Sequence, residues 1–406
     1  MSVLFESLQI GKLEVKNRFV RSATLENMAT EAGEVTDALV KLHTTLAKGQ
    51  VGLIIPGYMY VNPLGRAFKF QTGIYDDALI PGLKKLTDAI HSEDGKVAFQ
   101  IVHAGMQTFE RLIGRRPAGP TAEILNPVSI EYSREMTEEE IEDSIEDFVD
   151  AAKRAVESGT DGIQIHSAHG YLINEFISPF YNRREDKWGG SDESRFRYLR
   201  EIVIKIKKCL PSEIPLLIKL NTHDYTPDEG ITPPLAAKYS EWLIKLGIDA
   251  IEVSCGSATF SVFNMSRGEV PIEAIIQAVP DYLKDMATGL YQDMVGKYDL
   301  EEGYNLEAAK VIKKKIKHTP LMLVGGLRSK NFMEEVIEKQ YADFISMSRP
   351  FIREPFLIKG FKEGKKDKVA CISCNRCLGA LPNDYPVRCY TNKWPEKRLV
   401  TTYFPE

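Results

Sequence analysis

Short apolar runs alternate with longer amphipathic segments along most of this 406-residue chain. The apolar runs are 17–24, 51–57, 97–103, 162–167, 215–220, 250–255, 319–325 and 343–348. Their continuous hydrophobicity is typical of strands buried on both faces of a parallel sheet. The amphipathic segments predict helices over 36–49, 80–93, 137–158, 194–208, 235–246, 305–317, 331–339 and 355–363. Eight such strand–helix units predict a (β/α)8 TIM barrel, a fold of the α/β class.

The segment 137–158 is the clearest of the predicted helices. Thr137 and Glu140 have the spacing of a capping box, an apolar stripe follows, and Gly159 is a suitable stop. A doubly wound sheet that binds a dinucleotide would be favoured by a G-x-G-x-x-G motif after an early strand. The chain has no such motif, so the barrel is the preferred interpretation.

Two segments of the chain are additions to the eight strand–helix units of a minimal barrel. Residues 256–304 form a long insertion at the carboxyl end of the sixth strand, so we expect them to overhang the barrel mouth and cap a pocket. An oligomer contact or a surface loop is the alternative use of this insertion. Residues 365–406 form a cysteine-rich C-terminal segment, which divides the chain into a barrel over 1–364 and an appendage.

Composition and charge narrow the classes of function. The net charge of −5 argues against nucleic acid as a partner. No run approaches the 18 apolar residues of a membrane span, and the start lacks the basic and apolar regions of a signal peptide. We therefore expect a cytoplasmic protein without a membrane partner. We further expect a homo-oligomer, of a size that the sequence does not give.

Three titratable side chains follow the fourth predicted strand. His166, His169 and Tyr171 lie within six positions at the carboxyl end of the run 162–167. Unpaired buried polar groups cost about 1–3 kcal/mol each, so such a cluster has to be paired or used. Catalytic residues of TIM barrels lie at the carboxyl ends of the strands. The three residues are therefore the leading candidates for catalysis, with a structural histidine pair as the alternative.

Four of the six cysteines form a compact motif. Cys371, Cys374, Cys377 and Cys389 have the spacing C-x2-C-x2-C-x11-C. In a cytoplasmic chain such density favours a metal over disulfides. Thiolates at this spacing suit iron–sulfur or zinc. The residues alone leave a [4Fe–4S] cluster, a zinc site, an empty thiol knuckle and disulfides open.

Several ordered motifs carry a family resemblance over residues 3–360. They are LFESLQIGKLEVKNRFVRSA near the start, FQIVHAG at 99–105, IHSAHGYLINEFISP and NRREDKWGGS within 165–191, VGG at 324–326 and SRPFIREP from 348. Together they resemble the Old Yellow Enzyme family of FMN-dependent NADH:flavin oxidoreductases. The cysteine segment resembles the [4Fe–4S]-binding piece of the trimethylamine dehydrogenase and 2,4-dienoyl-CoA reductase branch.

The resemblance implies an FMN site at the barrel mouth. Donors for the phosphate come from the loops after strands seven and eight, where barrels often bind phosphate. Lys219 stands where the family usually has an arginine near flavin N1, and Gln100 matches the amide that pairs with the pyrimidine. The implied FMN residues are Ser22, Ala23 and Tyr58, expected to border the flavin largely through backbone groups, with Gln100, Lys219, Gly325, Gly326, Ser348 and Arg349.

The resemblance also implies reduction of activated C=C bonds in enone, enal or enoyl substrates, with NAD(P)H as co-substrate. His166 and His169 match the pair that binds the carbonyl oxygen of the substrate. Hydride is expected from flavin N5, and Tyr171 matches the general acid that protonates the other alkene carbon. The expected partner is a small unsaturated carbonyl compound.

The chain departs from the family pattern at several positions. Leu25 occupies a position that is often Thr or Cys beside flavin O4, and Met106 replaces a frequent Arg after the HAG motif. Ser348 replaces a frequent Gly. These departures leave the flavin potential and the substrate range open, and two other functions also stay open at this point. One is a flavo-iron–sulfur electron-transfer subunit, and the other is an amine dehydrogenase or demethylase with an aromatic cage drawn from Tyr58, Tyr60, Phe260 and Phe263.

Overall fold

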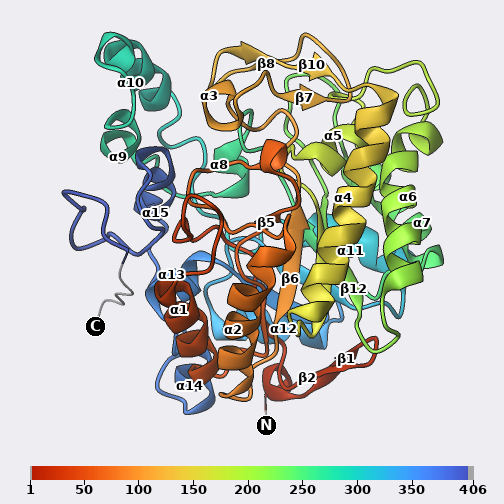
Figure 1. Cartoon of the computed structure of the whole chain (residues 1–406). Coiled ribbons are helices and arrows are strands. Elements are labelled where there is room, and N and C mark those ends of the chain that lie inside the picture. The colour runs from red at the N-terminus through yellow and green to blue at the C-terminus, as the bar shows by residue number, and fades with distance from the viewer. Residues whose placement is uncertain (1, 401–406) are drawn as a thin grey trace.

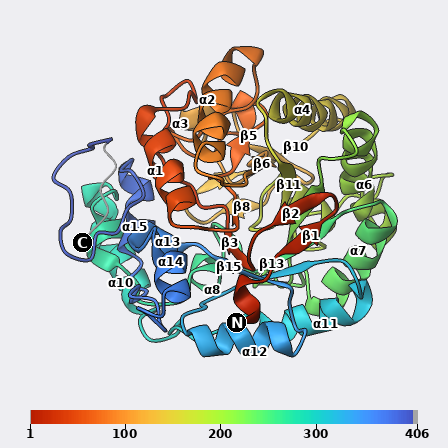
Figure 2. The ribbon, with the colours of Figure 1, turned by 90° about the horizontal axis from the view of Figure 1, so that it is seen from below.

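Parallel strands form a closed barrel in the computed structural model, which describes residues 2–400 (Figures 1 and 2). In barrel order they are β3 (Phe19–Arg21), β4 (Leu53–Ile54) with β5 (Met59–Tyr60), β6 (Ala98–Val102), β11 (Gly162–Ser167), β12 (Leu216–Asn221), β13 (Ala250–Ser254), β14 (Leu321–Val324) and β15 (Phe344–Met347). Each strand pairs in parallel with its neighbours, and β15 returns to β3. The predicted α/β TIM barrel is confirmed.

The second barrel strand is interrupted. Its first part, β4, pairs with β3, and its second part, β5, pairs with β6. The barrel closes where the Ile54 N–H donates to the Lys96 carbonyl at 2.8 Å. The four residues between the two parts make no ladder pairing. This break leaves Tyr58 outside the regular sheet, next to the barrel mouth.

Helices surround the sheet and cover its outer face (Figure 1). The covering helices are α1 (Asp37–Lys48), α2 (Ile80–His91), α4 (Glu138–Glu157), α6 (Asp192–Cys209), α7 (Pro233–Lys245), α11 (Leu306–Ile316), α12 (Lys330–Glu338) and α14 (Leu357–Lys362), the last preceded by the short α13 (Arg349–Arg353). Their apolar stripes pack on the outward-facing strand residues in the main core. The helix bounds agree with the predicted segments within a few residues.

An N-terminal hairpin closes the bottom of the barrel, a feature that the apolar pattern did not predict. It consists of β1 (Leu8–Ile10) and β2 (Leu13–Val15) and lies across the amino ends of the strands (Figure 2). The buried side chains of Ile10, Leu13 and Val15 join a cluster with inward-facing strand residues such as Leu217 and Met322. Apolar side chains therefore fill the bottom of the barrel. Active sites of TIM barrels lie at the opposite end, where the strands have their carboxyl ends.

The loops at the carboxyl ends of the strands contain the remaining larger elements. They are α3 (Glu110–Ile113), β7 (Ala118–Gly119), β8 (Leu125–Asn126), β9 (Glu131–Tyr132) and β10 (Arg134–Glu135) after the third barrel strand, α5 (Leu172–Ile177) after the fourth, and α8 (Val262–Met265), α9 (Ile272–Ile276), the 3-10 turn η4 (Asp281–Leu283) and α10 (Lys284–Gln292) after the sixth. Further 3-10 turns are η1 (Val3–Phe5), η2 (Pro63–Gly65) and η3 (Asp77–Leu79).

The cysteine segment packs against the loop after the sixth strand. It contains α15 (Arg376–Gly379) and η5 (Leu381–Asn383), and α15 lies beside α9 (Figure 1). The Asn375 amide donates to the Ser266 and Glu269 carbonyls at 2.7 and 3.0 Å. The Asn383 amide donates to the Ala274 carbonyl at 2.7 Å. These contacts join the insertion after the sixth strand to the cysteine segment, two parts that are far apart in the sequence. The last six residues of the predicted appendage lie outside the described residues.

None of the helices within residues 2–400 combines the length and apolarity needed to cross a bilayer.

The capping box of α4 gives a test of local stability. The Thr137 hydroxyl accepts from the Glu140 N–H at 3.2 Å, and the Glu140 carboxylate accepts from the Thr137 N–H at 3.1 Å. Thr137→Ala should lower the free energy of unfolding by about 1 kcal/mol, because one helix-end donor loses its partner. Thr137→Ser should retain most of this energy. Urea unfolding checks both variants, and equal losses would contradict a hydrogen-bonded cap.

Candidate functional site

A solvent-open hollow of about 1040 Å³ lies at the carboxyl ends of the barrel strands. We call it the mouth pocket. Apart from the cysteines, all residues predicted for the site line it except Gln100: Ser22, Ala23, Tyr58, His166, His169, Tyr171, Lys219, Gly325, Gly326, Ser348 and Arg349. The barrel thus brings together candidates that are far apart in the sequence.

His166 is a neutral hydrogen-bond donor at the end of β11. Its side chain is buried, and its Nδ1 accepts from the Ala168 N–H at 3.3 Å. That contact assigns the ring proton to Nε2. Burial holds the pKa of His166 well below its usual range, and the nearby His169 and the positive Lys219 add to this effect. The imidazole therefore stays uncharged at neutral pH and keeps one N–H to donate.

His169 faces the same part of the mouth pocket. Its ring lies 5.0 Å from that of His166 at an interplanar angle of 84°. Its Nε2 lies 2.7 Å from the Ser254 hydroxyl, which comes from the end of β13. Burial, followed by the charge of Lys219, lowers the pKa of His169 well below its usual value. Ser254 thus orients the second imidazole, a role that the sequence did not indicate.

Tyr171 lies in a corner made by His166 and Tyr58. Its ring is 5.0 Å from His166 and nearly perpendicular to it, at 86°. Its hydroxyl oxygen lies 2.8 Å from that of Tyr58. Burial raises the pKa of Tyr171 to about 12. The Tyr58 hydroxyl thus contacts the candidate general acid, and the expected backbone contact of Tyr58 with a flavin stays a prediction.

Lys219 lies on the floor of the mouth pocket in a buried ion pair. Its ammonium donates to the Ser22 hydroxyl at 2.7 Å and lies 3.1 Å from the Glu252 carboxylate. The barrel register places Lys219 beside both His166 and Glu252. A buried charge needs a partner of opposite sign, which Glu252 supplies. Sequence reasoning missed Glu252, although a carboxylate inside an apolar strand was a visible signal.

Gln100 is connected to this ion pair but does not line the mouth pocket. Its amide Nε2 donates to Gln164 Oε1 at 2.6 Å, and Gln164 Nε2 donates to the Glu252 carboxylate at 3.0 Å. The Gln100 Oε1 atom is buried and has no hydrogen-bond partner among the described residues. Its predicted contact with a flavin pyrimidine therefore stays a prediction.

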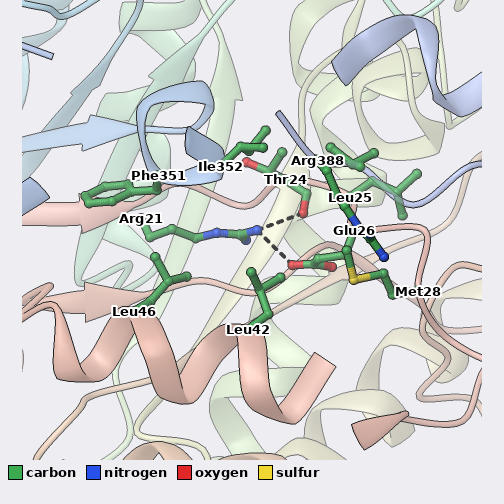
Figure 3. Close-up of a pocket in the computed structure, with 11 residues that line it drawn as sticks. Arg21, Thr24, Leu25, Glu26, Met28, Leu42, Leu46, Phe351, Ile352 and Arg388 are labelled. Atoms are coloured by element: carbon green, nitrogen blue, oxygen red, sulfur yellow. Dashed lines mark hydrogen bonds and ion pairs between the residues drawn. The ribbon is translucent and has the colours of Figure 1, made fainter. Parts of the chain in front are cut away.

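A second buried ion pair fixes the loop after β3 (Figure 3). The Arg21 guanidinium lies 2.8 Å from the Glu26 carboxylate, and His43 Nε2 lies 3.1 Å from it. The same carboxylate accepts the Gly57 N–H at 2.9 Å. Opposite charge and hydrogen bonds outweigh desolvation, so the pKa of Glu26 is lowered. This carboxylate holds the loop that carries Ser22 against the one that carries Tyr58.

The far end of the mouth pocket is rich in backbone groups and arginines. Gly325 and Gly326 follow β14 with φ of 142° and 68°, a conformation that side chains disfavour. A Cβ at Gly326 would lie 2.6 Å from the Glu301 carbonyl. Arg349 donates to the Arg267 carbonyl at 2.7 Å and to the Asn375 side chain at 2.5 Å. Such a concave, cationic end suits a phosphate.

Arg328 is a further arginine in this wall, and the sequence analysis did not single it out. It lines the mouth pocket and is 5% exposed. Its guanidinium donates to the Ser373 hydroxyl at 2.6 Å and approaches Cys371 Sγ at 4.0 Å. Burial lowers the pKa of Arg328, partly offset by the Cys371 sulfur. The signal available in the sequence was its position two residues after the glycine pair.

The four cysteines of the C-terminal segment form no disulfide, and Cys377 lies close enough to the other three to interact with them electrostatically. Cys377 lines the mouth pocket, and Cys389 Sγ lies 3.8 Å from the Arg353 guanidinium. Desolvation raises the pKa of Cys377 to about 12, and the three other cysteines add to the shift. Within residues 2–400, no group of three or more His, Cys, Asp or Glu side chains is arranged to hold a metal ion. Iron–sulfur and zinc therefore stay predictions.

The aromatic cage considered for an amine substrate does not assemble at the mouth pocket. Tyr58 lines it, but Tyr60 is buried and stacked on Tyr75 at 5.2 Å. Phe260 packs on Phe180 with 5.2 Å between ring centroids, and Phe263 is 2% exposed outside the lining. From the loop after the sixth strand, the mouth pocket instead receives Met265, Ser266 and Tyr304.

Comparison with known proteins defines the family. Residues 3–262 match the NADH:flavin oxidoreductase / NADH oxidase family. The chain belongs to this family. It is 30% identical to a 4,4'-dithiodibutanoate disulfide reductase of Rhodococcus erythropolis over 93% of each chain. It is 33% identical to an NADH oxidase of Thermoanaerobacter brockii over 96% of this chain and 56% of that protein.

A solved structure has a fold similar to that of this chain. The chain superposes on 2-naphthoyl-CoA reductase in complex with 2-naphthoyl-CoA with a TM-score of 0.83 and 28% identity, covering 96% of this chain and 57% of that one. The chain thus spans almost the whole disulfide reductase but little more than half of the other two relatives. The predicted family resemblance is confirmed, and the chain is an oxidoreductase of the NADH:flavin oxidoreductase family.

The mouth pocket fits FMN on its own chemistry. Its glycine and arginine end suits the phosphate, and Lys219 supplies a positive charge at the floor. The Ser346 hydroxyl lines the wall, is buried, and has no hydrogen-bond partner in the described part of the chain. An orphaned donor at the wall of an open pocket is expected where a polar ligand completes the site.

A buried histidine at the barrel mouth predicts how stability depends on pH. His103 follows β6, its Nδ1 accepts from the Gly105 N–H at 3.1 Å, and burial lowers its pKa to about 4. An unfolded histidine has a pKa of about 6.5. Between these values the unfolded chain binds a proton that the folded chain does not, so stability falls as the pH drops from about 6.5 to 4. The full contribution is about 3 kcal/mol.

His103→Gln keeps a polar group but removes the titration. Denaturant midpoints between pH 7.5 and 4 should fall less steeply for this variant than for the wild type. His43, His166 and His169 remain in both proteins, so the difference in slope isolates His103. Parallel curves for the two proteins would contradict a depressed pKa at this residue.

Proposed function

We propose that the protein is an FMN-dependent NAD(P)H oxidoreductase that reduces activated C=C bonds in enones, enals or enoyl compounds. The observation that carries this proposal is the corner formed by two neutral imidazoles and a protonated phenol at one wall of the mouth pocket. Hydrogen-bond donors for a developing negative charge and a separate proton source are the two needs of such a reduction. Both are met within one pocket.

FMN would be held by the residues that fit its parts. The phosphate would lie at Gly325, Gly326, Ser348 and Arg349, and Lys219 would face the pyrimidine side of the ring. Ser22, Ala23 and Tyr58 would border the ring, with Gln100 beneath it. When bound, FMN accepts hydride from NAD(P)H and passes it to the alkene. If donor and acceptor use the same mouth pocket in turn, the kinetics should be ping-pong.

His166 and His169 would bind the carbonyl oxygen of the substrate. His166 has a free Nε2–H, because its Nδ1 is occupied by the Ala168 N–H. His169 is held at Nε2 by Ser254, which fixes the angle of its ring. Neutral donors strengthen as the oxygen gains negative charge, and they need no proton transfer of their own. The low pKa of each imidazole keeps this state at neutral pH.

Tyr171 would hold the proton that the second alkene carbon receives. Burial raises the pKa of this phenol to about 12, so it is fully protonated at neutral pH. It releases its proton only to a carbon that has become strongly basic, which is the behaviour required of a general acid here. The edge of the His166 ring against Tyr171 keeps the phenol in place.

Stopped-flow flavin absorbance tests this function. NADH or NADPH should bleach the FMN of the anaerobic holoenzyme, and 2-cyclohexenone should restore its absorbance. Tyr171→Phe should slow the second step by about 10²–10⁴, because general acid catalysis contributes that much. Tyr225→Phe, a matched change outside the mouth pocket, should leave both steps near wild-type rates.

A flavin that neither nicotinamide bleaches would defeat the proposal. Bleaching followed by reoxidation only with 4,4'-dithiodibutanoate would instead assign the chain the substrate named for its Rhodococcus relative. Flavin reduction by a tertiary amine would assign it to the amine dehydrogenases.

An electron-transfer role through a [4Fe–4S] cluster is the second candidate function, favoured by the contact of Cys377 with the mouth pocket. We propose that Cys371, Cys374, Cys377 and Cys389 are the ligands. Their spacing and the arginines near Cys371 and Cys389 support this, because thiolates need nearby positive charge. No catalytic step above depends on the cluster.

Metal analysis of anaerobically purified protein tests this ligand set. We expect about four iron atoms and matching acid-labile sulfide per chain. Cys374→Ser should remove most of the iron, whereas Cys209→Ser, outside the motif, should not. Stoichiometric zinc would reassign the motif to a structural site, and absence of both metals would refute a metal role.

A further inference from the structure

Tyr58 and Tyr171 form a phenol pair inside the mouth pocket. The two hydroxyl oxygens lie 2.8 Å apart, and the two rings lie 5.3 Å apart at 50°. The residues come from the break in the second barrel strand and from the loop after the fourth strand. Among residues 2–400, Tyr58 is the one side-chain hydrogen-bond partner of the Tyr171 hydroxyl.

The two phenols differ in their access to water. Tyr171 is 4% exposed, whereas Tyr58 is partly exposed and also lines the solvent-open pocket. A bound substrate would cover Tyr171 further. The general acid has to regain a proton in every turnover, and the hydroxyl of Tyr58 is the protein group placed to deliver it.

Tyr58 is held in position from two sides. Its ring meets the edge of His166 at 5.5 Å and 74°. The preceding residue, Gly57, donates its N–H to the buried Glu26 carboxylate at 2.9 Å. The Tyr58 carbonyl accepts from the Gln71 amide at 3.0 Å. A phenol fixed at both its backbone and its ring can keep one hydrogen-bond geometry through a reaction.

We propose that Tyr58 is a positioning residue that orients the Tyr171 hydroxyl and returns a proton to it from solvent. This inference rests on the proposed function. In the protonation step the Tyr171 O–H bond breaks and a C–H bond forms at the alkene carbon. The Tyr58 proton moves to the Tyr171 oxygen, and water reprotonates Tyr58. The hydride that balances the reduction comes from NAD(P)H through FMN, so the relay itself moves protons only.

The charges around the pair agree with this direction. Burial raises the pKa of Tyr171, and the hydrogen bond from Tyr58 lowers it. Burial, Tyr171 and the Glu26 carboxylate all raise the pKa of Tyr58. His166 and His169 are neutral, and the ammonium of Lys219 is paired with the Glu252 carboxylate. Tyr171 is therefore the phenol that loses its proton first, and Tyr58 is the donor.

Tyr58→Phe tests the relay because it removes one hydroxyl and keeps the ring contacts. Reoxidation of the reduced holoenzyme by 2-cyclohexenone should slow about five- to tenfold, as expected for losing one hydrogen bond to a developing phenolate. Bleaching by NADH reports that the flavin is bound and reactive. The double variant Tyr58→Phe/Tyr171→Phe should be no slower than Tyr171→Phe alone, because Tyr58 acts through Tyr171.

The dependence of the reoxidation rate on solvent deuterium distinguishes a proton relay from a purely structural role of Tyr58. In mixtures of H2O and D2O, a plot of the wild-type reoxidation rate against deuterium fraction should curve downward. Such a curve is expected when two protons move in the same step. Tyr58→Phe should give a straight line, and Tyr225→Phe should keep the wild-type curve. A linear wild-type plot, or additive effects of the two tyrosine substitutions, would overturn the relay.

A measurement without turnover separates this inference from the proposed function. In protein labelled with [13Cζ]tyrosine, the Tyr171 resonance, assigned by its loss in Tyr171→Phe, should shift in Tyr58→Phe and stay in Tyr225→Phe. An unshifted resonance would overturn the phenol pair whatever the substrate proves to be. A shifted resonance in an enzyme that ignores enones would leave the pair intact and refute its assigned reaction, and the relay with it.

Discussion

Desolvation at the mouth of the barrel sets the protonation state of its candidate catalytic groups. The same removal of water keeps two imidazoles uncharged and a phenol protonated, because each charged form would lose its hydration. Three groups that titrate differently in water thus all stay uncharged at neutral pH. The two histidines can then stabilise charge on an oxygen while Tyr171 retains a proton for carbon.

Two ion pairs lie buried in this environment. Arg21 and Glu26 form one pair, and Lys219 and Glu252 form the other. Removing one partner of such a pair costs about 3–5 kcal/mol, because the other is left buried and uncompensated. Each pair also positions a part of the mouth pocket. Glu26 ties two loops together, and Glu252 connects Lys219 to the amides of Gln164 and Gln100.

The loop after the sixth strand and the cysteine segment act as one wall. Asn375 bonds to that loop and also accepts from Arg349, which closes the eighth strand. Arg328 connects the glycine turn after β14 with Ser373. The end of the mouth pocket that carries the glycine pair and the arginines is therefore built partly from the C-terminal segment.

The sequence by itself determined the strands and helices of the barrel and indicated many of the residues that line the mouth pocket. Continuous apolar strands, amphipathic helices and local caps are short-range signals, so the eight strand–helix units and the capping box at Thr137 were readable directly. Position at a strand end was enough to indicate His166, His169 and Tyr171. The N-terminal hairpin escaped prediction because its three-residue strands carry almost no periodic signal.

Only the tertiary structure decided which groups touch. His169 and Ser254 are 85 residues apart in the chain, and Tyr58 and Tyr171 are 113 apart. Lys219 meets Glu252 because the register of two neighbouring strands aligns them. Barrel closure and strand register are collective results of packing, and no local pattern encodes them. For that reason the sequence could name Tyr171, the two histidines and Lys219 as candidates, but not their contacts with the hydroxyls of Tyr58 and Ser254 or with the carboxylate of Glu252.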